Sequence, residues 1–167
     1  MGRWRAPVPA SSPYITAEGY LHLETELKDL WERRKEVTGA LAAAAAEGDR
    51  SENAEYIYRK KELRELDARI GYLQRRMPAL KIVREVGDTN SIFFGAWVTI
   101  VDADGIESVY RIVGPDEIDD SMEYISIDSP MARALRNKHI DDEFSLNNGA
   151  ELRQYLIKDI RYETIPH

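Results

Sequence analysis

A short stretch of the chain, Gly48 to Tyr56, holds three carboxylates within seven residues: Asp49, Glu52 and Glu55. Carboxylate oxygens are hard ligands that suit Mg²⁺, which normally keeps several waters and is shared with phosphates. Two such groups alone would hold the metal weakly. The spacing therefore favours half of a site, completed by a partner that already holds a metal and a nucleic-acid phosphate. There, an added carboxylate could retain a second Mg²⁺ and orient a water for attack on a phosphodiester.

The same residues have a second interpretation that involves no chemistry. Asp49 is followed three residues later by Glu52, with Ser51 between them, and this pattern is typical of a helix N-cap with a reciprocal acidic partner. Acidic side chains also suit the positive end of a helix. Spacing alone leaves both capping and catalysis open.

Two apolar series flank the acidic stretch, and in each the residues are spaced alternately by three and four. This periodicity predicts two helices of about 30 residues that pair as an antiparallel coiled coil roughly 45 Å long. Such an arm could carry the acidic stretch into a hole in another molecule. The alanines from Ala42 to Ala46 would keep the arm thin, or would simply let the helices pack closely. The predicted seam residues are Tyr20, Leu23, Leu27, Leu30, Arg34, Val37, Leu41 and Ala44, then Tyr56, Arg59, Leu63, Leu66, Ile70, Leu73, Met77 and Leu80.

After Lys81 the apolar period changes to two, which indicates strands. Ser129 and Pro130 are typical of the cap and first residue of a short helix through Arg136. We therefore predict an α+β fold, with a flexible tail at 1–13, a helical hairpin at 14–83 and a small antiparallel β domain with one short helix at 84–167. The expected strands are 96–101, 108–113, 124–127, 143–146 and 151–157.

Composition excludes several classes of protein. The chain has no cysteine, so disulfides and thiolate metal sites are excluded, and no apolar run reaches the roughly 20 residues of a membrane helix. We expect a soluble, cytoplasmic protein. The net charge is −7, and its negative part lies in residues 84–167, which hold 8 basic and 17 acidic residues, whereas residues 1–13 add two positive charges and residues 14–83 are balanced. That balance excludes nucleic-acid binding by bulk charge, so any RNA contact must be local.

The stretch Gly48-Asp49-Arg50-Ser51-Glu52-Asn53-Ala54-Glu55-Tyr56 resembles the tip motif of the bacterial Gre transcript cleavage factors. Similarity continues in Ile15-Thr16-Ala17-Glu18-Gly19-Tyr20, in Phe93-Phe94-Gly95-Ala96-Trp97-Val98, and in the run from Tyr124 to Leu135. It spans roughly residues 14–162. Leu30-Trp31, Arg50-Ser51 and Arg111-Ile112-Val113-Gly114 are more similar to the GreB branch than to GreA.

This resemblance implies a specific function. In that family the coiled coil enters the secondary channel of RNA polymerase, and tip acids help the polymerase hydrolyse the 3′ end of backtracked RNA. By position, these catalytic acids are Asp49 and Glu52, which would share Mg²⁺ with the polymerase. The factor would bind no metal alone and would not cleave RNA by itself. The second domain would be FKBP-like and would dock on the channel rim, and the free protein is expected to be a monomer.

The resemblance also implies two binding surfaces. Residues matching the family's docking contact are Asp128, Ser129 and Pro130, although Ser129 and Pro130 would start a helix in any protein. A basic patch that would hold the extruded RNA comprises Arg50, Lys60, Lys61 and Arg64. Glu62 interrupts this patch, and together with Glu65 it could reduce the patch to ordinary solvated charges.

Two other functions stay open at the level of sequence. A relative that only plugs the channel would share the fold but inhibit the polymerase; here both tip acids are kept. An FKBP-like domain could instead act as a prolyl isomerase, with Trp97, Tyr110 and Tyr124 as pocket aromatics. Such aromatics are more often core residues.

Overall fold

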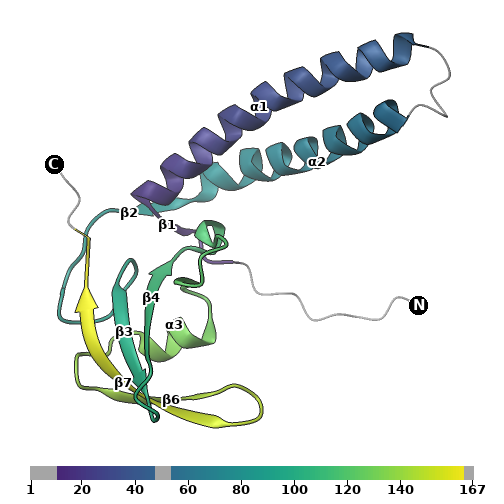
Figure 1. Cartoon of the computed structure of the whole chain (residues 1–167). Coiled ribbons are helices and arrows are strands. Elements are labelled where there is room, and N and C mark those ends of the chain that lie inside the picture. Colours follow the sequence, from purple (N-terminus) through teal and green to yellow (C-terminus); the bar gives the residue numbers. More distant parts are fainter. Residues whose placement is uncertain (1–10, 48–53, 164–167) are drawn as a thin grey trace, which may run out of the picture. The chain divides into compact units, whose positions relative to one another are not determined.

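A computed structural model describes residues 11–47 and 54–163 of the chain. The chain divides into two compact units (Figure 1). The helical unit comprises residues 18–80. The sheet unit comprises the described residues up to Ala17 together with those from Lys81 onward. The α+β fold class predicted from the sequence is confirmed.

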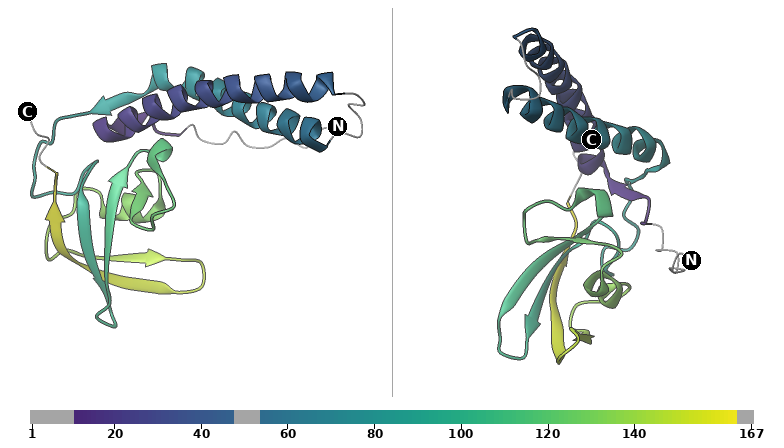
Figure 2. Two further views of the ribbon diagram at one scale, coloured as in Figure 1. Left: turned by 45° about the horizontal axis from the view of Figure 1, so that its top comes forward. Right: turned by 90° about the vertical axis from the view of Figure 1, so that its right-hand side faces the viewer.

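The helical unit is a hairpin of α1 (Ala17–Ala46) and α2 (Ala54–Arg76), which run side by side (Figures 1 and 2). Every residue of the two predicted seams is buried or half-buried. Val37 and Leu73 are almost fully buried, as expected of apolar side chains at a helix–helix seam.

Ion pairs between α1 and α2 show in which relative direction the two helices run. Arg33 contacts Glu62 at 2.6 Å and Arg69 contacts Glu26 at 2.7 Å. From the first pair to the second, the residue on α1 lies seven positions earlier in the chain and the residue on α2 lies seven positions later. The helices are therefore antiparallel, as predicted.

The second helix is shorter than the predicted 30 residues. It ends at Arg76, where a 3₁₀ turn, η1 (Met77–Ala79), takes over. Pro78 explains the change, because proline has no amide hydrogen to donate to the preceding helical turn. Met77 and Leu80 nevertheless stay at least half-buried, so the seam continues beyond the α-helical residues.

The larger sheet of the sheet unit contains five strands: β3 (Trp97–Asp102), β4 (Glu107–Val113), β5 (Tyr124–Ser126), β6 (Glu143–Asn147) and β7 (Leu152–Arg161). Their order across the sheet is β5-β4-β3-β7-β6. Four of the strands match the predicted segments to within one residue at each end, whereas β7 continues four residues beyond the predicted end at Ile157. One expectation was wrong: the sheet is mixed rather than antiparallel, because β5 pairs in parallel with β4. The 3₁₀ turn η2 (Pro115–Glu117) interrupts the chain between these two strands, so β5 does not return as a hairpin partner.

The predicted turn between β3 and β4 forms around Asp102. One oxygen of its carboxylate accepts hydrogen bonds from the backbone N–H groups of Asp104 and Ile106, each at 2.9 Å. Gly105 has a φ of +78°, a value that glycine adopts without steric cost.

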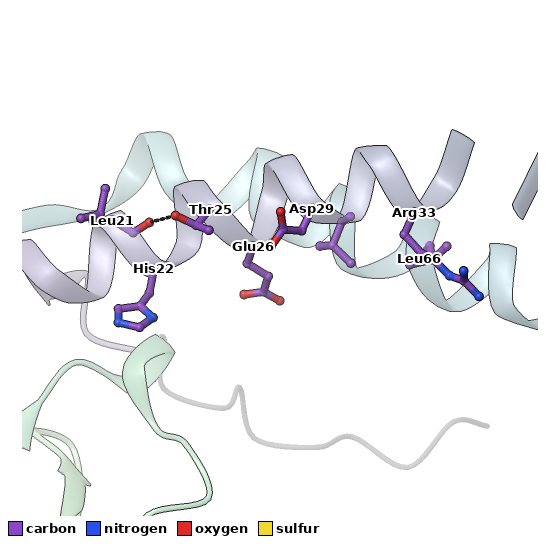
Figure 3. Close-up of a pocket in the computed structure, with 8 residues that line it drawn as sticks. Leu21, His22, Thr25, Glu26, Asp29, Arg33 and Leu66 are labelled. Atoms are coloured by element: carbon purple, nitrogen blue, oxygen red, sulfur yellow. Dashed lines mark hydrogen bonds between the residues drawn. The ribbon is translucent and has the colours of Figure 1, made fainter. Parts of the chain in front are cut away.

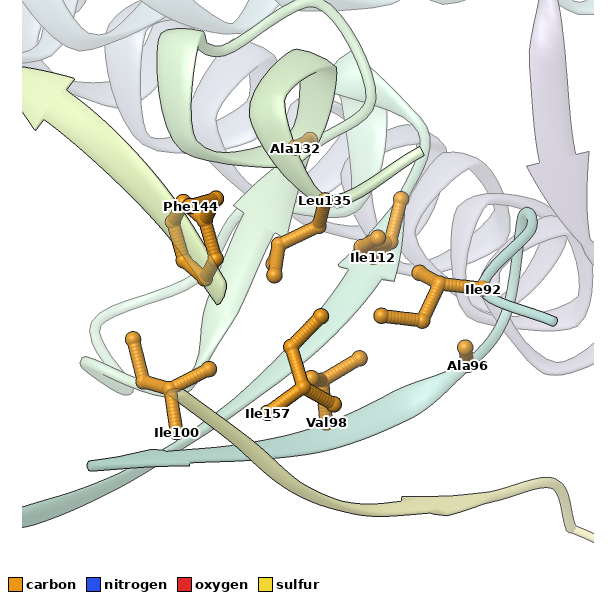
Figure 4. Packing of buried hydrophobic residues seen from close by; sticks show 9 residues of the cluster. All are labelled: Ile92, Ala96, Val98, Ile100, Ile112, Ala132, Leu135, Phe144 and Ile157. Atoms are coloured by element: carbon orange, nitrogen blue, oxygen red, sulfur yellow. The ribbon is translucent and has the colours of Figure 1, made fainter. Parts of the chain in front are cut away.

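Helix α3 (Pro130–Leu135) closes the core of the sheet unit. Leu135 and Ala132 pack against β-strand residues such as Val98, Ile112 and Ile157, all almost fully buried (Figure 4). This packing fixes the start of α3, where two of the predicted docking residues lie.

A second, two-stranded sheet pairs β1 (Tyr14–Thr16) in parallel with β2 (Lys81–Val83). Of the predicted tail at 1–13, residues 1–10 lie outside the described residues. Its last residues are not a free tail: Ser12 bonds to Asp128, and the carbonyl of Pro13 accepts a hydrogen bond from Lys81 at 2.7 Å.

Candidate functional site

The acidic stretch that carries the predicted chemistry connects the two helices of the hairpin. Helix α1 ends at Ala46 and α2 begins at Ala54. Asp49, Arg50 and Glu52 belong to residues 48–53, which lie outside the described residues. Their assignment as catalytic, RNA-binding and Mg²⁺-sharing residues therefore stays a prediction.

Three of the predicted RNA-binding residues lie on the first turns of α2. Lys60, Lys61 and Arg64 are all exposed. Within the described ranges none of them forms an ion pair, although the Lys60 ammonium lies 5.9 Å from the centroid of the Tyr56 ring. Their charges are available to an anionic partner.

Glu62 does not interrupt this basic surface as the sequence suggested. Its carboxylate turns toward the hairpin seam, where it contacts Arg33 at 2.6 Å and Arg59 at 3.0 Å. The hydrogen bond from Arg33 is the main reason why the pKa of Glu62 lies below its ordinary value. Two guanidinium groups thus neutralise Glu62, whereas Glu65, the other acid beside these basic residues, is exposed and forms no ion pair among the described residues.

The predicted docking residues lie together at the start of α3. The Ser129 hydroxyl caps the helix by accepting a hydrogen bond from the Ala132 N–H at 3.2 Å, and Pro130 is the first helical residue. Both oxygens of the Asp128 carboxylate bind Ser12, one through its backbone N–H at 2.9 Å and the other through its hydroxyl. Ser129 is therefore the N-cap of α3, and the docking role of these residues stays a prediction.

Sequence reasoning missed the contact between Ser12 and Asp128. The two residues are 116 positions apart, and Ser12 lies in a serine- and proline-containing stretch that resembles a linker. The only sequence feature that could have indicated this hydrogen bond is the pair of polar residues Ser11 and Ser12, shortly before β1. Beside this contact a groove is lined by Tyr14, Phe93 and Ile127, with Arg133 and Arg136 among its other lining residues.

Two of the aromatic residues considered for an isomerase pocket, Trp97 and Tyr124, form cation–π contacts with arginines. Trp97 and Tyr124 lie 5.9 Å apart, and the guanidinium of Arg111 sits 5.7 and 5.8 Å from their ring centroids. Arg161 lies 5.2 Å from the Trp97 ring. These four residues form a row across adjacent strands of the sheet, and Tyr110 packs against the core. Cation–π packing accounts for the row without a substrate.

A hollow on α1 contains a histidine beside acidic residues (Figure 3). His22 and Glu26 line it, and the Thr25 hydroxyl donates a hydrogen bond to the Leu21 carbonyl at 3.0 Å. Glu26 is already paired with Arg69. In the part of the chain that the structure describes, no group of three histidine, cysteine, aspartate or glutamate side chains could hold a metal ion. None of the helices among the described residues combines the length and the hydrophobicity of a membrane-spanning segment.

Comparison with known proteins gives a consistent result over nearly the whole chain. The family description "Transcription elongation factor, N-terminal" matches residues 13–82, and "Transcription elongation factor, GreA/GreB, C-term" matches residues 87–162. The chain is 52% identical to transcription elongation factor GreB of Xanthomonas axonopodis pv. citri, covering 99% of this chain and 100% of that protein. It is 50% identical to GreB of Pseudomonas aeruginosa with the same coverage.

Among solved structures, the transcription factor Gfh1 is 27% identical, with a TM-score of 0.45 over 90% of this chain and 98% of the other. The family matches on both units, together with the full-length identity to GreB proteins, show that this chain belongs to the GreA/GreB family of transcription elongation factors, on its GreB branch.

Proposed function

We propose that the protein enters the secondary channel of RNA polymerase with its helical hairpin and stimulates the polymerase's own hydrolysis of backtracked RNA. Arrested elongation complexes would then resume synthesis. The observation that carries this proposal is the paired hairpin, whose two described helix ends, Ala46 and Ala54, are connected by the segment that contains Asp49 and Glu52.

The hairpin has the dimensions and cohesion that such a role requires. The 30 residues of α1 correspond to about 45 Å of helix. Arg33, Arg34 and Arg69 each bind an acidic residue of the other helix at 2.6–2.7 Å. Exposed pairs of this kind contribute little individually, but several of them oppose separation of the helices along the hairpin.

The donor set suits a shared magnesium ion. Mg²⁺ requires six oxygen ligands in near-octahedral geometry, and Asp49 and Glu52 supply two carboxylates. The remaining ligands would come from the polymerase, its RNA and water, so the free protein would bind no metal. When bound, the ion would supply the charge that activates water and stabilises the phosphate. The protein would be no enzyme by itself, because its acids serve the polymerase's site.

The two other surfaces would position the factor and its substrate. Lys60, Lys61 and Arg64, with Arg50 nearby in the sequence, would hold phosphates of the RNA 3′ segment without reading its sequence. Asp128, Ser129 and Pro130 would dock on the polymerase rim. The fixed start of α3 supports this role, because a preorganised surface loses less entropy on binding. The free protein would be a monomer.

The decisive experiment adds the protein to a backtracked elongation complex with Mg²⁺ and follows the length of the RNA. We expect shortened RNA with the native protein and none with Asp49→Asn, because asparagine still caps a helix but brings no negative charge. Protein without polymerase should leave free RNA intact.

Two results would change this proposal. If Asp49→Asn cleaved normally and lost only thermal stability, helix capping would be the role of Asp49. If the native protein bound the complex but blocked synthesis without cleavage, the factor would be a channel inhibitor. Equal polymerase binding by both proteins, measured by competition, excludes a trivial loss of affinity.

A further inference from the structure

The first turns of α2 expose apolar side chains on the side away from the seam. Ile57 is 55% exposed and Tyr58 is 61% exposed. The seam in this part of α2 is formed by Tyr56 and Arg59, so neither exposed residue packs in it. A helix in a two-helix hairpin normally places polar residues at such positions. Adjacent apolar side chains rimmed by charge are typical of a contact surface.

Cations surround this apolar pair at helical spacing. Lys61 follows Tyr58 by three residues and Ile57 by four, and Lys60 follows Ile57 by three. Arg64 lies one further turn along the same side. Within the residues described, none of these three cations forms an ion pair with Glu62 or Glu65, and Glu62 contacts Arg33 and Arg59 instead. The surface therefore combines an aromatic ring with positive charge and favours an anionic, aromatic ligand.

One face of the Tyr58 ring forms a cation–π contact with Arg59. The guanidinium of Arg59 lies 5.5 Å from its centroid. Arg59 is itself fixed by Glu55 at 2.9 Å and Glu62 at 3.0 Å. Because the side chain remains 61% exposed, the opposite face is accessible. A flat ligand that stacks there meets a ring already held in place, which lowers the entropic cost of binding.

We propose that Tyr58 stacks on an unpaired base of the extruded RNA 3′ segment, with Ile57 packing beside it and Lys61 and Arg64 on the flanking phosphates. This inference rests on the proposed function and adds a base-binding residue to it. Tyr58 lies four residues into α2, about 6 Å from its first residue. Stacking tolerates any sequence, as a factor acting on all transcripts requires.

The test uses backtracked elongation complexes that carry 2-aminopurine in the extruded 3′ segment. Quenching of its fluorescence, measured before Mg²⁺ is added, reports stacking without cleavage. RNA shortening is followed after Mg²⁺ addition, at subsaturating factor. The variants are Tyr58→Leu, which keeps apolar bulk but removes the aromatic face, and Tyr58→Phe, which restores it.

The matched control is Tyr72→Leu. Tyr72 also lies on α2 with an arginine, Arg69, 5.4 Å from its ring, and is 38% exposed. It stands 14 residues from Tyr58, about 21 Å along the helix. Removing its ring repeats the chemical change far from the proposed contact.

We expect Tyr58→Leu to abolish the quench and to slow cleavage by about 5- to 140-fold, the range for loss of one base–aromatic stack. Tyr58→Phe and Tyr72→Leu should quench and cleave like the native protein. An abasic residue in place of the stacked nucleotide should slow the native protein equally, with no further loss in Tyr58→Leu.

Other outcomes separate the inference from the function on which it rests. Cleavage by Tyr58→Leu at the native rate, with no quench by either protein, would overturn the stacking contact and leave the proposed function intact. A quench that depends on Tyr58 without any cleavage would support stacking and refute the cleavage function. Weaker binding of Tyr58→Leu to polymerase without extruded RNA would instead show that the ring contacts protein, which also overturns the inference.

Discussion

Replacing Gly114 with alanine should loosen β1 from the rest of the sheet unit. A Cβ atom on Gly114 would lie 1.9 Å from the carbonyl oxygen of Tyr14, whereas real Cβ atoms stay at least 3.0 Å from such neighbours. The Tyr14 carbonyl would have to retreat by about 1.1 Å, the difference between these distances. The backbone angles of Gly114, φ −74° and ψ 159°, are open to alanine, so the cost is steric contact and not backbone strain.

The hydrogen bonds of the Glu117 carboxylate set the size of the effect. One of its oxygens accepts the Gly114 N–H at 2.7 Å and the Thr16 N–H at 3.0 Å, and the other accepts the Thr16 hydroxyl. Displacing β1 by an ångström breaks the bonds to Thr16. A hydrogen bond to a charged group contributes about 1.5–3 kcal/mol, so with partial relaxation the variant should lose about 2–4 kcal/mol.

Urea unfolding of the full chain, followed by near-ultraviolet circular dichroism, measures this loss. Gly87→Ala is the matched control in the same unit, because its Cβ would meet nothing within 4 Å. The control should stay within about 0.5 kcal/mol of the native protein. Equal unfolding free energies for the two variants would refute the reasoning, because Tyr14 would then not be wedged against Gly114.

Two further predictions concern stability. Gly39→Ala should raise the free energy of unfolding by about 0.5–1 kcal/mol, because Gly39 lies inside α1 with open space at its Cβ; lower stability in thermal unfolding would contradict this. Burial raises the pKa of Tyr162, whose hydroxyl donates to the Ser91 carbonyl and accepts the Phe93 N–H at 2.9 Å. The folded pKa exceeds the unfolded value of 10.0, so this stabilisation is complete below pH 10 and is lost as pH rises through the folded pKa. Unfolding free energies measured from about pH 8 to 11 should fall less in Tyr162→Phe, and a parallel fall would argue against Tyr162 as the source.

The sequence by itself determined the elements and their faces. The three-four spacing identified every seam residue of the hairpin, because helical periodicity is a local property that the packing then follows. Ser129 and Pro130 marked the start of α3 for the same reason, since a cap is made by neighbours in the chain. Pro78 also carried a local signal, and the shortening of α2 could have been predicted from it.

Only the tertiary structure decided which distant residues meet. The parallel pairing of β4 with β5, the contact of Ser12 with Asp128 and the turn of Glu62 toward Arg33 join residues whose partners depend on the path of the chain between them. The hydrophobic period and the composition of α2 would be the same if Glu62 were solvated as when it contacts Arg33, so neither could predict this contact. Its side-chain direction is set by a helix 29 residues away, and that direction leaves the basic face of α2 free for an anion.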